Sequence, residues 1–326
     1  MQPRQWWATL ALTAIATVTT AAYASAAQGS YPNAPITMIV PFAAGSGTDA
    51  VARAVGQKLG ERLQQPVIVD NRAGANAQIA AGLVAKAKPD GYTLFMTTNT
   101  SHSANPWLVK SLKYDPIKDF TPIARVGELP FALAVHPSVP ADSVQTLIDY
   151  AKANPGKLSY ATPNSTSLVA SETLRFLSKT DIVGVPYKSS PQALTDLMGN
   201  QVQMYVVDLG SGWSMLKTDR VRTLAVTAAK GSKILPHVPP IGKTLPGFDI
   251  TSWNGIFAPA GTPPEVVNKI NGALQAVLAD EAVQKQLEQI GFEVWPTKTP
   301  QEFAQYVSEQ LAYWGRLVKQ ADIPAQ

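Results

Sequence analysis

The sequence contains no cysteine and only three histidines. Without cysteine no disulfide can hold the fold, so a hydrophobic core must supply the stability. The chain also has no thiol that an oxidising compartment could oxidise. The histidines His102, His136 and His237 lie far apart and lack a metal-ligand spacing such as H-E-x-x-H. The sequence therefore predicts no metal site.

Charged residues are also few, at 15% of the chain, and the formal net charge is +4. Lysines and arginines are scattered, and no basic run has aromatic residues between its charges. Nucleic acid is therefore not an expected partner, although a mild positive field modestly favours small anions. Beyond residue 26, no segment approaches the roughly 20 apolar residues that span a membrane.

Residues 1–26 have the pattern of a secretory signal peptide. Arg4 supplies the positive start, Trp6 to Val18 the apolar centre, and the small residues up to Ala24 or Ala26 a cleavage site. A membrane anchor is the alternative, but the apolar centre is short and diluted by threonines. We expect an exported, soluble mature protein.

The mature chain alternates between strand and helix patterns. Ile36–Val40 is a short apolar run typical of a buried strand, and a helical stripe begins near Asp49. Further strands are expected at Pro66–Asp70 and Tyr92–Thr97. A second block of the same kind begins near Pro140. This alternation predicts an α/β fold with parallel strands, and the length allows two domains.

Small polar residues follow three of the predicted strands, at Gly45–Asp49, Thr98–Ser103 and Pro163–Ser167. Free backbone N–H groups at the positive end of a helix attract anions, and ligands bind open α/β sheets at the carboxyl ends of strands. The first stretch could also be an ordinary turn, and the second a solvated surface loop. Three such stretches on two blocks predict a binding cleft between domains.

Sequence signatures of catalysis are missing. The chain has no Walker P-loop, no G-x-G-x-x-G spacing and no G-x-S-x-G elbow. Ser46 as a nucleophile would need a nearby base, and without one its loop can only bind. We therefore expect a binding protein rather than an enzyme, with no catalytic residue, no cofactor and no metal.

Motifs along the whole mature chain carry a family resemblance. They include Ile39–Asp49, Asn71–Ala75, Pro89–Leu94, Asp115–Ile123, Ala151–Lys157, Val185–Lys188, Leu224–Thr227 and Ala258–Pro263. In this order they resemble the tripartite tricarboxylate transporter substrate-binding proteins, also called the Bug or TctC family. The resemblance covers essentially the whole mature sequence.

The resemblance implies a two-lobed periplasmic binding protein, an α/β fold of the type II-like "Venus flytrap" kind. Two crossover strands are expected near Ile123–Leu133 and Phe248–Phe257. Lobe one would then comprise residues 27–127 and 251–326, and lobe two residues 128–250.

The resemblance also implies where the ligand lies. Expected contacts on lobe one are Phe42, Ala43, Ala44, Gly45, Ser46, Gly47, Thr48, Asp49, Thr98, Thr100 and Ser101, and on lobe two Asn164, Ser165, Thr166, Tyr187, Lys188, Ser189 and Asp208. The stretch Thr162–Ser167 departs from the glycine-rich run of the family. Pro163 removes one N–H donor. Leu168 lies near the sequence position at which members of the family usually have a histidine. Whether this stretch still contacts ligand is open, and Trp107 and Trp213 could narrow the cleft.

The function implied is capture of a small organic acid, a mono- or dicarboxylate, aliphatic or aromatic. A monomeric periplasmic protein would deliver it to integral membrane transporter subunits. Two alternatives stay open: a sensor that signals to a membrane histidine kinase, and an exported α/β carboxylate-ester hydrolase. The sequence does not name the ligand.

Overall fold

The computed structural model describes residues 31–326. The predicted signal peptide, residues 1–26, lies outside the described residues. None of the helices within 31–326 is long and apolar enough to cross a membrane.

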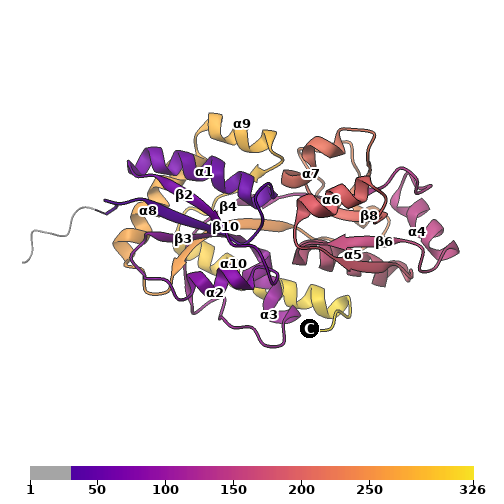
Figure 1. The fold of residues 1–326 in the computed structure, drawn as a ribbon, viewed down its shortest axis with the longest axis horizontal. Helices are drawn as coiled ribbons and strands as arrows, with labels where there is room; N and C mark the ends of the chain where they lie inside the picture. Colours follow the sequence, from indigo (N-terminus) through magenta and orange to yellow (C-terminus); the bar gives the residue numbers. More distant parts are fainter. Residues whose placement is uncertain (1–30) are drawn as a thin grey trace, which may run out of the picture.

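Two separate β-sheets organise the molecule, side by side in Figure 1. The six-stranded sheet has the order β11 (Glu293–Val294), β4 (Phe120–Leu129), β10 (Ser252–Pro259), β3 (Thr93–Thr98), β1 (Ile36–Val40), β2 (Val67–Asn71). The five-stranded sheet has the order β7 (Val183–Pro186), β6 (Ser159–Thr162), β8 (Met204–Asp208), β5 (Phe131–Val135), β9 (Arg222–Val226). We call the part around the first sheet lobe one and the part around the second lobe two.

The chain crosses between the lobes at two places. The first crossing is an almost continuous strand, because only Pro130 separates β4 from β5. The second crossing runs through residues 227–251 and is mostly irregular, and β10 begins only at Ser252, later than the strand expected from Phe248. The α/β two-lobed fold expected from the sequence is confirmed.

In lobe one, β1 lies between β2 and β3 in parallel register, with Met38 opposite Val69 and Leu94. Helix α1 (Gly47–Leu63) packs with α8 (Pro264–Leu278) and α9 (Glu281–Gln289). On the other side of the sheet in Figure 1 lie α2 (Gln78–Val84), α3 (Asn105–Leu108) and α10 (Pro300–Gln320). Helices thus cover both faces of the sheet, as its buried strands require.

In lobe two, four helices accompany the strands: α4 (Val144–Ala153), α5 (Ser165–Ser178), α6 (Ser190–Met198) and α7 (Leu209–Leu216). α5, α6 and α7 each begin within four residues of the end of β6, β7 or β8. Because β6 lies parallel to β7 and to β8, these three helix starts gather at one edge of the sheet, the edge that faces lobe one.

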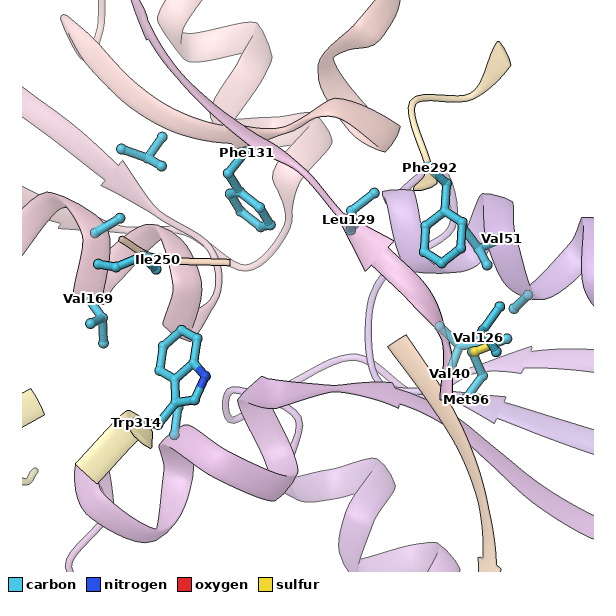
Figure 2. Close-up of a cluster of buried hydrophobic side chains, with 14 of the residues drawn as sticks. Val40, Val51, Met96, Val126, Leu129, Phe131, Val169, Ile250, Phe292 and Trp314 are labelled. Atoms are coloured by element: carbon cyan, nitrogen blue, oxygen red, sulfur yellow. The ribbon is translucent and has the colours of Figure 1, made fainter. Parts of the chain in front are cut away.

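The apolar core extends across the first crossing. Figure 2 shows Leu129 and Phe131 on the crossing strand, one on each side of Pro130, and Trp314 of α10 in the same apolar cluster as Ile250 and Val169. Trp314 is fully buried. Lobe one therefore touches lobe two through apolar as well as polar groups.

The start of α10 supplies a test of local stability. Thr299 is its N-cap, and the Thr299 Oγ1 accepts a hydrogen bond from the Glu302 N–H at 3.1 Å. Thr299→Ala removes this acceptor, so we expect the free energy of unfolding to fall by about 1 kcal/mol. Urea unfolding measures this change. Thr299→Ser keeps the hydroxyl acceptor and should therefore retain most of the wild-type free energy of unfolding. A loss below about 0.3 kcal/mol would contradict the cap.

Candidate functional site

A small pocket lies where the two lobes meet, and we call it the inner chamber. Its volume is about 20 Å³, room for roughly one water molecule. Lobe one contributes Phe42, Ser46, Gly47, Thr48, Thr98, Thr100 and Ser252, the crossing strand Leu129 and Phe131, and lobe two Asn164, Thr166, Ser190 and Asp208. Hydroxyl and amide groups dominate this lining, and no lysine, arginine or histidine belongs to it.

A larger groove of about 780 Å³ adjoins the inner chamber, and we call it the outer groove. Phe42 and Asn164 line both spaces. Tyr187, Lys188 and Ser189 form one side of the groove, and Lys188 is the one cationic side chain among its lining residues. A molecule with one end in the chamber could extend into this groove.

Three helices begin at the inner chamber. Ser46, Asn164 and Ser189 are the N-caps of α1, α5 and α6, and each side chain accepts a hydrogen bond from an N–H of its own first turn. In each first turn one further chamber-lining residue, Thr48, Thr166 or Ser190, has a backbone N–H with no acceptor within residues 31–326. The partial positive charge of three helix starts therefore points at one small space.

The loop before α1 is held by a buried carboxylate. Asp49 Oδ2 accepts the Gly45 N–H at 2.9 Å, and Asp49 Oδ1 accepts Asn71 Nδ2 at 2.9 Å. Arg53 forms an ion pair with Asp49 at 3.0 Å. Burial raises the pKa of Asp49, but the hydrogen bonds from Arg53, Gly45 and Asn71 outweigh it and hold the pKa below its usual value. Asp49 thus shapes the loop and lines neither the chamber nor the groove.

Asp208 links the lobes through Ser211. The Gly47 N–H donates to Ser211 Oγ at 3.0 Å, and Ser211 Oγ donates to Asp208 Oδ2 at 3.0 Å. The Ser211 N–H donates to Asp208 Oδ1 at 2.7 Å, which makes Asp208 the N-cap of α7. Burial raises the pKa of Asp208, although the bonds from Ser211 oppose this. A second carboxylate placed next to Asp208 would be repelled.

Two glycines allow the backbones of the two lobes to approach. A Cβ on Gly47 would stand 2.3 Å from Asp208 Oδ1, and a Cβ on Gly210 would stand 2.5 Å from the Gly47 Cα. Neither position has room for a side chain. Gly47 and Gly210 therefore mark the place where α1 and α7 meet in this closed arrangement.

The stretch after β3 differs from the polar loop expected at Thr98–Ser103. Thr98 is the last residue of β3, and Thr100–Ala104 form a π-helical turn, η1, whose side chains are all buried. Thr98 and Thr100 line the chamber, whereas Ser101 turns away and bonds Thr97 and His102. The alternative of a solvated surface loop is wrong, because the aromatic core behind η1 buries the whole turn.

The predicted contact residues fall into three groups. Nine line the inner chamber: Phe42, Ser46, Gly47, Thr48, Thr98, Thr100, Asn164, Thr166 and Asp208. Ala43, Tyr187, Lys188 and Ser189 line the outer groove. Ala44, Gly45, Asp49, Ser101 and Ser165 line neither space.

Four chamber residues were not predicted from the sequence: Leu129, Phe131, Ser190 and Ser252. Leu129 and Phe131 lie in apolar strand patterns that predict only core residues. Ser190 precedes Pro191 in a pattern typical of a helix start, and this pattern could have placed Ser190 at the site. No sequence pattern marks Ser252. Pro163 and Leu168, where the chain departs from the family pattern, both line the outer groove, and Trp107 and Trp213 line neither space. Within residues 31–326 no group of histidine, aspartate and glutamate side chains could hold a metal ion.

Comparison with known proteins places this geometry in a family. Rpa4515 from R. palustris, solved with adipate, is 34% identical, covers 91% of this chain and all of its own, and gives a TM-score of 0.88. The periplasmic binding protein BugD is 32% identical over 91% of this chain and all of its own, with a TM-score of 0.86. MatC from Rhodopseudomonas palustris, solved with malate, is 32% identical over 88% of this chain and all of its own, with a TM-score of 0.83.

The model of one protein family matches residues 51–323. The resemblance seen in the sequence motifs is thereby confirmed over most of the chain. This chain belongs to the tripartite tricarboxylate transporter family of receptors, the TctC or Bug family.

Proposed function

We propose that the protein binds a small organic carboxylate between its lobes, with one carboxylate group in the inner chamber. One observation carries this proposal: the unbonded N–H groups of Thr48, Thr166 and Ser190 belong to three helix starts that meet there. Helix N-termini bind anions without a cationic side chain, and charge-assisted hydrogen bonds contribute about 1.5–3 kcal/mol each.

The ligand class follows from the two connected spaces. In this arrangement the chamber has room for about one water molecule, so it would take only one carboxylate group of the ligand, held by the N–H groups of the helix starts and away from the carboxyl group of Asp208, which would repel it. The rest of the ligand would extend past Phe42 and Asn164 into the outer groove, where Lys188 offers a positive charge. A linear dicarboxylate fits this arrangement, and the adipate and malate found with two relatives support it.

We further propose that the protein works in the periplasm and hands its ligand to membrane subunits of a tripartite transporter. The family match and the periplasmic relative BugD support this role. Of the described residues, 31–127 with 251–326 would move as one lobe and 128–250 as the other, so that the boundary falls within β4, near the crossing between the two sheets. Closure on the ligand would then create the surface that the membrane partner recognises.

A thermal-shift screen of the protein against organic acids tests the proposal. Adipate, malate, hexanoate, benzoate and terephthalate, each titrated up to about a hundred times its Kd, should separate the classes. A bound acid stabilises the folded protein by about 2.7 kcal/mol under these conditions. We expect adipate or malate to raise the melting temperature and the corresponding amides or alcohols to have no effect. No shift with any acid would reject the proposal.

A further inference from the structure

A second set of contacts joins the lobes beside the inner chamber. Asn76 Nδ2 of lobe one donates to Ser165 Oγ at 2.7 Å, and Asn99 Nδ2 donates to Thr166 Oγ1 at 2.9 Å. Ser165 and Thr166 are the first two residues of α5. Two carboxamides of lobe one therefore hold the first turn of a lobe-two helix.

Lobe one orients both carboxamides through its own hydrogen bonds. Asn76 Nδ2 also donates to Asn105 Oδ1 at 2.9 Å, and Asn105 Nδ2 donates to the Asn76 carbonyl at 2.7 Å. Ser252 Oγ donates to Asn99 Oδ1 at 2.6 Å, which leaves the Asn99 NH₂ to face Thr166. Because these bonds lie within lobe one, the donors keep their direction whether or not lobe two is near.

The backbone around Asn76 is strained. Ala75, Asn76 and Ala77 have positive φ angles of 46°, 49° and 72°, a conformation that side-chain-bearing residues adopt reluctantly. Such strain persists only where the surrounding structure enforces it, and it concentrates at functional sites. Here it aims the Asn76 side chain at the opposite lobe.

The contacts act on the helix rather than on the ligand. Asn99 and Ser165 line neither the chamber nor the groove, and Asn76 borders only the groove. Thr166, in contrast, lines the chamber. Its hydroxyl accepts a hydrogen bond from Asn99 Nδ2, and its backbone N–H has no acceptor within residues 31–326. Fixing the hydroxyl therefore fixes the position of the N–H.

We propose that Asn76 and Asn99 are positioning residues, which clamp the first turn of α5 onto lobe one when the lobes close and so hold the Thr166 N–H against the bound carboxylate. This inference rests on the proposed function. In the open protein the clamp is broken and both sides are solvated. Its bonds therefore add to ligand affinity and not to the stability of the ligand-free protein.

Two small substitutions test the clamp. Ser165→Ala removes the acceptor of Asn76, and Asn76→Gly removes the donor while suiting the positive φ. We expect each to weaken the binding of adipate or malate, whichever stabilises the wild type in the screen, by about tenfold, as one lost hydrogen bond allows. Dissociation should be faster in both variants, and the melting temperature without ligand should be unchanged in Ser165→Ala. Asn76→Gly also loses its bond to Asn105 within lobe one, so its effect is judged on the Kd alone.

Matched controls for both variants are available in lobe two. Ser171→Ala changes the same residue type in the same helix at a buried hydroxyl with no hydrogen-bond partner, and Asn200→Gly changes an asparagine with a positive φ of 56° away from the cleft. Both controls should leave the Kd within a factor of two of the wild type.

Two results would overturn the clamp. One is an unchanged Kd in both clamp variants. The other is a ligand-free melting temperature that falls in Ser165→Ala as much as the ligand-bound one, since that would show a permanent contact. If no acid binds the wild type, the proposed function fails separately, and the ligand-free melting temperatures still decide whether the contact is permanent.

Discussion

Gly47→Ala is expected to weaken ligand binding by a hundredfold or more while the protein still folds. Gly47 is the first residue of α1, a position at which alanine is well tolerated. In the closed arrangement, however, the added Cβ would lie 2.3 Å from Asp208 Oδ1 and 2.9 Å from Leu129 Cδ2. The clash opposes closure, and a hundredfold loss corresponds to about 2.7 kcal/mol. Isothermal titration calorimetry with the acid found in the screen measures it.

Gly210→Ala tests the same contact from the other lobe. Its Cβ would lie 2.5 Å from the Gly47 Cα, a backbone atom that cannot rotate away. We expect a similar loss of affinity. Gly272→Ala is the matched control, because it lies on an exposed face of α8 with no atom within 4 Å of an added Cβ. Normal affinity in both cleft variants would show that the lobes do not meet at these glycines when ligand is bound.

Acid should destabilise the protein through His102. This ring is fully buried, stacks on Phe257 with the centroids 3.9 Å apart and bonds Ser101 Oγ at 2.8 Å. Burial lowers its pKa to about 3. Between its unfolded value near 6.5 and about 3, the unfolded chain binds more protons than the folded one, so the free energy of unfolding falls as the pH falls. The expected loss between pH 8 and pH 5 is about 2 kcal/mol.

His102→Gln should remove most of this pH dependence, since glutamine can keep a bond to Ser101 without titrating. His237→Gln, at an exposed histidine, is the matched control. Urea unfolding at pH 8, 6.5 and 5 measures the slope for each protein. A slope that persists in His102→Gln would assign the acid sensitivity to groups other than His102. Asp49 is not among them in this range, because its lowered pKa affects stability only at more acidic pH.

Local patterns sufficed for much of the fold. The apolar run at Ile36–Val40 and the small residues after it predicted β1, the loop and α1 almost to the residue, because burial and capping are short-range properties. The predicted cleft edges at Gly45–Asp49 and Pro163–Ser167 supply chamber residues on both lobes. Ser46 and Asn164 are N-caps, and N-cap residues can be recognised from the local sequence, which explains why these two helix starts were predictable.

Features that depend on long-range packing were not predictable. Leu129 and Phe131 look like ordinary core residues, and only the crossing of the chain between lobes places them at the chamber. The polar residues of Thr98–Ser103 predicted a loop. In the structure this segment is buried, and the aromatic side chains of Phe95, Phe120 and Phe257 pack around His102. Asp49 is predicted at the ligand, and only the three-dimensional structure shows that its carboxylate also holds the loop, through bonds from Gly45 and Asn71.

The central claim is that backbone amides from three helix starts, on both lobes, hold one carboxylate. Amide chemical shifts of ¹⁵N-labelled protein test it most directly, with adipate or malate added stepwise. We predict that the Thr48, Thr166 and Ser190 signals shift together and report the same Kd, while the amides of α4 and α9 stay in place. Saturable binding that leaves those three signals unmoved would contradict the account.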